Sequence, residues 1–352
     1  MLTITTSSLD AEWILFPHSG GVGPGASAPY NPAVTTSISP ADRILGCLIG
    51  GAVGDALGFQ VEFQSWPQIE REFGPAGVTE LRRNRISDDT QMTLFTAEGL
   101  LEAVEGEEVA SVRRAYLRWY KTQNEYLPPM GAKGLAAQPW LYDRRAPGNA
   151  CLSGLRQGGE GRVNPDSKGC GTVMRSAPFG LLHSPTDAYE LAEQCSAITH
   201  GHPTAGSSAG AFAMITAHLL RGETVQKAVS HAMLHLRRTL DRSETIDALQ
   251  AAYELAGNVP PGPNTCERLG QGWVAEEALA IAVYCLLGTG DVRGALTASV
   301  SHDGDSDSTG AILGNLLGAA YGHAALPPEW ASQVEGRETI AGLAETIGQA
   351  QG

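Results

Sequence analysis

Two short segments of this 352-residue chain concentrate carboxylate and hydroxyl groups where a helix is expected to begin. The first reads Ser87-Asp88-Asp89-Thr90, and the second, residues 303–309, reads DGDSDST. One acid or hydroxyl is enough to cap a helix N-terminus. Several acids packed together repel one another unless a cation neutralises them. We therefore expect a site for hard divalent cations such as Mg²⁺, which prefer oxygen ligands.

An EF-hand is the obvious rival explanation for the second segment. If Asp303 held the first position of such a loop, the sixth would be Ser308 and the twelfth Gly314. An EF-hand needs glycine at the sixth position and glutamate at the twelfth. The segment therefore does not predict an EF-hand.

A third acidic pair, Asp55 and Glu62, lies in the apolar, glycine-rich run 43–63. Helical spacing of the apolar residues predicts a helix over this run, which places the two acids two turns apart on one face. A carboxylate in such surroundings is either paired or functional, and the pattern leaves both open.

Glycines at steps of four mark the two helices that must position these acids. Gly46, Gly50, Gly54 and Gly58 form one stripe, and Gly310, Gly314, Gly318 and Gly322 form the other. Each glycine costs about 1 kcal/mol in a helix relative to alanine. A whole stripe therefore indicates very close approach of another backbone. We expect the two helices to form the packed centre and to pack against each other.

The remaining periodicity is also helical, and strand-like alternation is nearly absent. Six further runs predict helices, at residues 90–104, 112–123, 187–199, 209–222, 224–240 and 276–288. Pro- and Gly-rich loops are expected over 126–169 and 257–272. The sequence predicts one compact all-α domain over 39–352, preceded by a flexible Gly/Pro/Ser-rich extension at 1–38.

Composition excludes several classes of protein. The net charge of −14 argues against nucleic-acid binding, which normally needs a basic stripe. No apolar run is long enough to span a membrane, and the N-terminus does not resemble a signal peptide. The cysteines show no regular spacing, which indicates reduced thiols and a cytoplasmic protein; they are Cys47, Cys151, Cys170, Cys195, Cys266 and Cys285.

Four motifs, in order, resemble the ADP-ribosylglycohydrolase family, all-α hydrolases that include the dinitrogenase-reductase-activating glycohydrolase. They are GAVGD at 51–55 with Glu62, SDDTQM at 87–92, GCGTVMR at 169–175 and GDSDSTG at 304–310. The resemblance covers residues 41 to 322 and favours the arginine-directed branch. Ser87 and Ser308 stand where many members have threonine, and both keep a hydroxyl.

The resemblance implies a hydrolase that removes ADP-ribose from ADP-ribosylated proteins with two Mg²⁺ ions, which Mn²⁺ could replace. The implied metal ligands are Ser87, Asp88, Asp89, Asp305, Asp307 and Ser308. Glu62 and Asp89 are the implied catalytic acids. The implied substrate-binding residues are Gly169, Cys170, Gly171, Thr172, Met174 and His200, and His202 belongs to the same region. The backbone amides of residues 169–172 would face the diphosphate, since glycine allows close approach. Taken alone, the glycine segment favours a simple loop.

Three other functions remain in competition. G-x-S-x-G at 206–210 would suit a serine hydrolase if a strand preceded it, but the pattern favours helix packing. A zinc site from Cys195, His200 and His202 fits no familiar spacing. The N-terminal extension, with apolar anchors at 13–16, could let the protein act as an immunity protein that blocks an ADP-ribosylating toxin.

Overall fold

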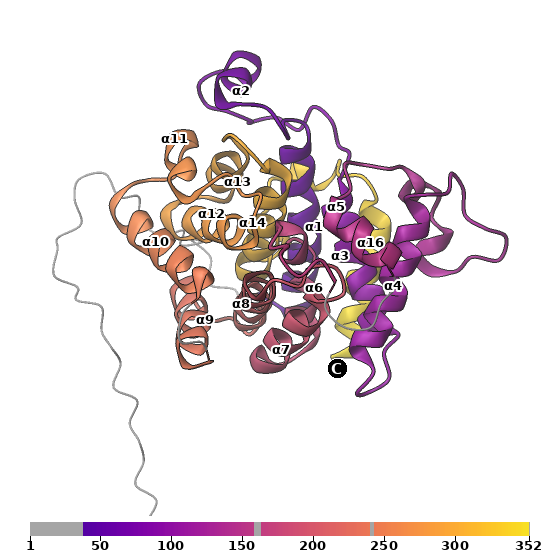
Figure 1. The fold of residues 1–352 in the computed structure, drawn as a ribbon. Coiled ribbons are helices and arrows are strands. Elements are labelled where there is room, and N and C mark those ends of the chain that lie inside the picture. The colour runs from indigo at the N-terminus through magenta and orange to yellow at the C-terminus, as the bar shows by residue number, and fades with distance from the viewer. Residues whose placement is uncertain (1–37, 158–162, 240–242, 352) are drawn as a thin grey trace, which may run out of the picture.

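The described residues of the computed structural model, 38–157, 163–239 and 243–351, contain sixteen α-helices, five 3₁₀ helices and no β-strand (Figure 1). The prediction of an all-α fold is confirmed. No helix among them is long and apolar enough to cross a membrane. Residues 1–37 lie outside the described residues, so the predicted domain boundary and the anchors at 13–16 stay predictions.

The first eight α-helices run as follows: α1 Pro40–Phe59, α2 Trp66–Phe73, α3 Asp88–Leu101, α4 Glu108–Thr122, α5 Asn149–Gln157, α6 Ala177–Leu182, α7 Pro185–Ser196 and α8 Pro203–Leu220. The second eight are α9 Val225–Thr239, α10 Glu244–Asn258, α11 Pro263–Cys266, α12 Ala275–Gly288, α13 Val292–Val300, α14 Ser306–Tyr321, α15 Pro328–Ala331 and α16 Arg337–Ala350. The 3₁₀ helices are η1 Gly134–Ala137, η2 Pro139–Tyr142, η3 Cys170–Thr172, η4 Glu267–Leu269 and η5 His323–Ala325.

Helices α1 and α14 form the centre of the molecule and pack along their glycine stripes (Figure 1). A Cβ added to Gly54 would lie 1.9 Å from the carbonyl oxygen of Gly310, and one added to Gly318 would lie 1.9 Å from that of Gly46. No side chain fits at such a distance. The prediction that the two glycine-striped helices pack against each other is confirmed.

Six further predicted helices are present as α3, α4, α7, α8, α9 and α12. The predicted loop 126–169 is not entirely a loop, because it contains η1, η2 and α5. Its proline and glycine residues flank these short helices and hide their periodicity. Likewise, α10 extends to Asn258, and α11 and η4 lie within 257–272. All six cysteines are free thiols, as predicted.

The prediction that Glu62 lies on the first helix is wrong. Helix α1 ends at Phe59, and the chain turns through Gln60 to Phe63. The turn is fixed by a hydrogen bond from the Val61 amide to the Gly58 carbonyl at 2.9 Å. Phe63 has a positive φ of 67°, which a helix cannot accommodate. Glu62 is therefore presented by a turn beyond the helix that carries Asp55.

Candidate active site

One cavity of about 730 Å³ collects most of the residues that the sequence singled out. It opens where the N-termini of α3 and α14 meet the turn after α1 and the 3₁₀ helix η3. The predicted residues that line it are Glu62, Asp88, Asp89, Gly169, Cys170, Gly171, Met174, His200, Asp305, Asp307 and Ser308.

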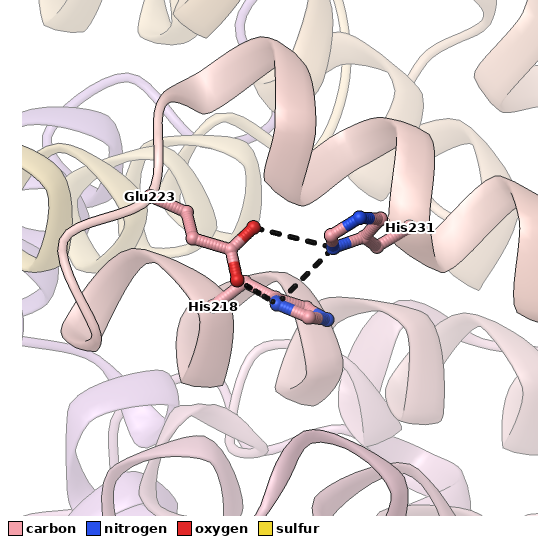
Figure 2. Close-up of side chains that lie close together, drawn as sticks. All are labelled: His218, Glu223 and His231. Atoms are coloured by element: carbon pink, nitrogen blue, oxygen red, sulfur yellow. Dashed lines mark hydrogen bonds and ion pairs between the residues drawn. The ribbon is translucent and has the colours of Figure 1, made fainter. Parts of the chain in front are cut away.

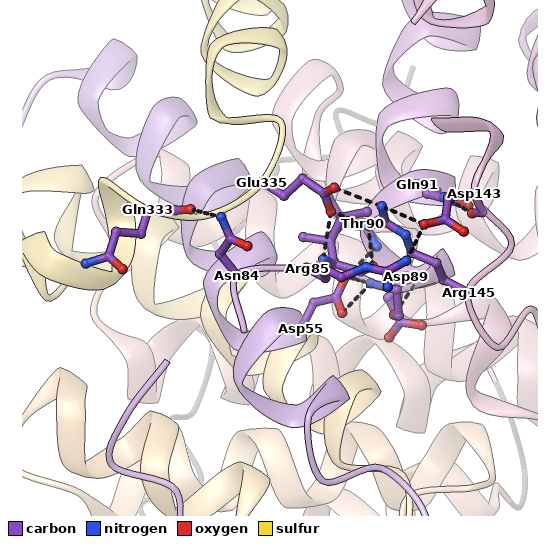
Figure 3. A network of polar contacts seen from close by, with 12 residues as sticks. Asp55, Asn84, Arg85, Asp89, Thr90, Gln91, Asp143, Arg145, Gln333 and Glu335 are labelled. Atoms are coloured by element: carbon purple, nitrogen blue, oxygen red, sulfur yellow. Dashed lines mark hydrogen bonds and ion pairs between the residues drawn. The ribbon is translucent and has the colours of Figure 1, made fainter. Parts of the chain in front are cut away.

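Asp55 holds the first acidic motif in place through hydrogen bonds (Figure 3). This fully buried carboxylate on α1 accepts hydrogen bonds from the amide of Ser87, at 2.8 and 3.0 Å, and from the amide and hydroxyl of Thr90. Ser87 caps α3 by accepting from the Asp89 amide at 3.2 Å. The role of Asp55 is therefore to fix the start of α3, and Asp55 itself does not line the cavity.

Arg145 holds the segment before α3 in place (Figure 3). Its guanidinium donates to the Ile86 carbonyl at 2.9 Å and pairs with the carboxylate of Glu335, between α15 and α16. Its own carbonyl accepts from the Asp88 amide at 3.3 Å. Gly148 donates from its backbone to the Asp88 carboxylate at 3.2 Å. Both the backbone and the side chain of Asp88 are thus held in place.

The second acidic motif is held by the start of α14 and by η3. Asp305 caps α14 by accepting from the Ser308 amide, and it also accepts from the thiol of Cys170 at 2.7 Å. The Ser308 hydroxyl in turn donates to the Cys170 sulfur at 3.5 Å. Burial and the nearby Asp305 raise the pKa of Cys170, so its thiol keeps its proton. Cys170 therefore orients a carboxylate as a neutral donor.

The two acidic motifs face each other across the cavity. Burial raises the pKa of Asp307, and the side chains of Asp305 and Ser87 partly offset this increase. Burial raises the pKa of Asp88, of Asp89 and of Asp305, and repulsion from Asp307 raises each of them further. Oδ2 of Asp89 is buried and has no hydrogen-bond partner among the described residues. This arrangement disfavours ionisation of these carboxyl groups unless a cation binds near them.

Glu62 and two aromatic rings form another part of the cavity wall. Burial, followed by repulsion from Asp307 and Asp305, raises the pKa of Glu62 to about 10. Next to it, Phe63 stacks on Trp273 with ring centroids 5.4 Å apart and planes 16° apart. Both rings line the cavity. The aromatic pair gives the cavity wall an apolar surface close to the carboxyl group of Glu62, which can carry a proton.

His200 is fixed as a neutral imidazole. Arg175, which is 1% exposed, donates to the Thr199 hydroxyl at 2.7 Å, and that hydroxyl lies 2.7 Å from Nδ1 of His200. Burial and the Arg175 charge lower the pKa of His200 to about 3. We assign the imidazole proton to Nε2, because the Thr199 hydroxyl, which accepts from Arg175, can donate its own proton to Nδ1. Nε2 lies beside Gly169 and Gly171.

Some predicted residues lie outside the cavity wall. Thr172 is fully buried and donates to the Ala205 carbonyl at 3.0 Å. Ser87 is also fully buried, behind Asp89. His202 caps α8 by accepting from the Thr204 amide at 3.2 Å. The Cys170 amide, expected to face a diphosphate, donates instead to the Trp273 carbonyl at 3.1 Å.

The structure excludes two of the rival sites. Ser208, the serine of G-x-S-x-G, lies inside α8, is fully buried and hydrogen-bonds to Thr245 at 2.8 Å. It is not on a strand-to-helix turn. Cys195, His200 and His202 do not form a metal-binding group among the described residues.

Several residues of the cavity were not predicted from the sequence. They are Phe63, Arg144, Ala146, Pro147, Gly148, Asn149, Ala150, Cys151 and Trp273. Most of them belong to the connection that leads into α5, which carried no recognisable motif. Single aromatic residues such as Trp273 give no signal in a sequence, because an isolated tryptophan is most often part of a core.

Comparison with known proteins places this geometry among related chains. A sequence model of the family described as ADP-ribosylglycohydrolase matches residues 36–352. The chain is 27% identical over 316 residues to the ADP-ribosyl-[dinitrogen reductase] glycohydrolase of Rhodospirillum rubrum, covering 85% of this chain and 92% of that one. It is 24% identical to the ADP-ribosylarginine hydrolase Tri1 of Serratia proteamaculans, covering 87% and 79%. A solved structure titled ADP-ribosylglycohydrolase-related protein complex superposes with a TM-score of 0.64 at 27% identity, covering 89% and 99%.

Proposed function

The chain belongs to the ADP-ribosylglycohydrolase family and is a glycohydrolase, and we propose that it removes ADP-ribose from modified arginine side chains of proteins with the help of two Mg²⁺ ions. The observation that carries the proposal is the convergence of two acidic helix starts and Glu62 on one cavity. The preference for arginine is supported by the relative named an ADP-ribosylarginine hydrolase and by the form of the second motif.

The residues present fit a pair of hard cations. The proposed ligands are the carboxylates of Asp88, Asp89, Asp305 and Asp307 with the hydroxyls of Ser87 and Ser308. All are oxygen donors, and the buried Oδ2 of Asp89 has no partner among the described residues. Among the described residues, no three of these acids have carboxylate oxygens that all lie within 4.8 Å of one another. The four carboxylates and Ser308 line one cavity, which has room for two ions with water ligands. Mn²⁺ accepts the same donors.

Each remaining cavity residue has a role that follows from its contacts. When bound, the cations supply Lewis acidity toward ribose hydroxyls and water. Glu62 holds or moves a proton at its carboxyl group near the scissile bond, where positive charge develops on the ribose. Nε2–H of His200 donates a hydrogen bond into the cavity beside Gly171. Phe63 and Trp273 offer a stacked, partly exposed aromatic surface next to Glu62, on which a flat part of the substrate can pack.

The substrate preference can be tested by following release of free ADP-ribose from two peptides, one modified on arginine and one on serine. With Mg²⁺ present we expect release from the arginine conjugate and much slower release from the serine conjugate. EDTA should stop both reactions. An equal or reversed preference would remove the arginine assignment and leave the glycohydrolase intact. Release that persists in EDTA would remove the metal-dependent mechanism.

The cations can be tested without any activity assay, through thermal unfolding at pH 5 and at pH 8. Burial raises the pKa of Asp55 to about 7 and raises those of Asp88, Asp89 and Asp305. An acid whose pKa is raised on folding contributes stability at low pH that is lost as the pH rises through the folded pKa. In EDTA these groups therefore destabilise the protein at pH 8 relative to pH 5. We expect Mg²⁺ to raise Tm more at pH 8.

The control for this experiment is Asp187→Asn, at an exposed carboxylate near the start of α7. It should retain the full Mg²⁺ effect, whereas Asp305→Asn should reduce it. If Mg²⁺ shifted Tm equally at the two pH values, or not at all, the proposed cation site would be wrong.

A further inference from the structure

A second cluster of metal-ligating side chains lies away from the acidic cavity, where α8 turns into α9 (Figure 2). It consists of His218 near the end of α8, Glu223 in the connection and His231 in α9. Among the described residues it is the only trio of His, Cys, Asp or Glu whose ligand atoms all lie within 4.8 Å of one another. We propose that this histidine–glutamate trio binds a divalent transition-metal ion, with Zn²⁺ the best match.

The backbone holds the three residues together without any ion. Helix α8 ends at Leu220, and Gly222, with a φ of +82°, reverses the chain two residues later. The Glu223 amide then donates back to the His218 carbonyl at 3.2 Å, which places the glutamate over the last turn of α8. His231 approaches from α9, which packs against α8. The donors therefore come from two packed helices and a closed turn, all of them fixed in the fold.

The distances between ligand atoms are close to those of a tetrahedral site. Zinc bonds of about 2.0–2.1 Å at tetrahedral angles separate the ligand atoms by about 3.3 Å. The two Nδ1 atoms of His218 and His231 are 3.3 Å apart, and His231 Nδ1 is 3.2 Å from Oε2 of Glu223. His218 Nδ1 is 2.7 Å from Oε1, so this pair must open by about 0.6 Å to admit an ion.

The hydrogen bonds within the trio leave one carboxylate oxygen of Glu223 without a partner among the described residues. A proton on His218 Nδ1 serves the hydrogen bond to Oε1 of Glu223 and cannot also join the two histidines. Oε2 of Glu223 is buried, and it has no hydrogen-bond partner in the described part of the chain, although His231 Nδ1 lies 3.2 Å away. One cation between the three side chains would use both imidazole lone pairs and the carboxylate together.

The trio is accessible to an ion from solvent. The side chains of His218, Glu223 and His231 are 14%, 29% and 39% exposed. A surface cavity of about 360 Å³ adjoins Glu223 and His231, and water there can complete the coordination. Two cationic residues also line this cavity. Arg221 donates to the Ala217 and His183 carbonyls, and Lys227 places the other positive charge nearby, which weakens the affinity.

A bound ion would tie α8 to α9 across their connection. Helix α8 also packs on α7, α12 and η3, and η3 carries part of the cavity wall described above. Because an ion that binds only the folded protein stabilises it by mass action, this site would strengthen the support of that wall. The proposal concerns stability and ion binding, and it stands or falls independently of the hydrolase activity.

The test is a calorimetric titration of tag-free, full-length, chelator-treated protein with ZnCl₂, with excess Mg²⁺ present to occupy the acidic cavity. The wild type should bind one Zn²⁺ that His231→Ala and Glu223→Gln weaken by more than about 100-fold, since loss of a direct ligand exceeds the loss of a supporting contact. His235→Ala, one helical turn further along α9, is the matched control and should bind as the wild type does. Co²⁺ should give the visible absorption of a tetrahedral site in the wild type and the control only.

Glu223→Gln keeps the shape of the side chain, so it remains informative even if a histidine variant is poorly folded. Circular dichroism would establish that each variant is folded. If folded His231→Ala and Glu223→Gln gave the same Zn²⁺ isotherm as the wild type, or if the wild type bound no Zn²⁺ under these conditions, the proposal would be overturned.

Discussion

Asp305→Asn is expected to lower kcat for release of ADP-ribose by about 10²–10³-fold or more, the range for loss of one group that stabilises charge in a transition state. Asp305 lines the cavity, accepts from the Cys170 thiol and caps α14. Asparagine is as good an N-cap as aspartate, so the helix start should survive the substitution. The loss then reports on the negative charge that the proposed cations need. Single-turnover kinetics on an ADP-ribosylated arginine peptide would measure it.

Asp303→Asn is the matched control, two residues away in the same acidic segment. Asp303 accepts from the Trp66 amide at the start of α2 and does not line the cavity. We expect its kcat to remain within a few-fold of the wild type. Equal losses in the two variants would mean that the segment acts as a structural unit, and no loss in either would contradict the assignment of Asp305.

Gly54→Ala is expected to destabilise the protein by about 3 kcal/mol or more, the upper range for overpacking a well-packed core. The new methyl group would lie 1.9 Å from the Gly310 carbonyl oxygen, with backbone on both sides and no side chain free to move away. Forcing α1 and α14 apart would also displace Asp55 from the start of α3. Chemical denaturation followed by circular dichroism would measure the free energy of unfolding, and we expect hydrolase activity to fall with it.

Gly342→Ala is the matched control, for which we expect the opposite effect on stability. Gly342 lies in α16, and a Cβ added there would have no neighbour within 4 Å. Because alanine is favoured over glycine in a helix, this variant should be more stable than the wild type by about 0.5–1 kcal/mol. If both alanine variants changed stability alike, close contact between α1 and α14 would not explain the glycine stripe.

The central helix pair and the acidic residues could be predicted from the sequence because their signals are local. A glycine at every fourth position has few explanations besides close helix packing, and crowded acids at a helix start have few besides a cation site. The way these groups are supported could not be predicted. Asp55 was noticed as a buried acid, but only the fold shows that it accepts hydrogen bonds from Ser87 and Thr90.

The errors came from contacts between segments far apart in the sequence. The run around Glu62 looks helical, but the chain turns after Phe59, where the Gln60 side chain donates to the Glu80 carbonyl and accepts from the Arg82 amide. Cys170 was expected to bind substrate through its amide, which instead pairs with the Trp273 carbonyl. The His218, Glu223 and His231 trio was missed because its spacing fits no familiar motif and depends on the turn at Gly222.

The contact between α1 and α14 has a consequence for how the protein is made. The two helices are the first and the fourteenth of the sixteen α-helices in the described chain. The ribosome must therefore synthesise all the residues between Gly54 and Gly310 before the two glycines can meet. Contacts of such long sequence separation form late and slowly in folding. Until that contact forms, the carboxylates at the start of α3 do not face those of the second acidic motif across the cavity. A nascent or truncated chain that lacks α14 is therefore expected to have no hydrolase activity.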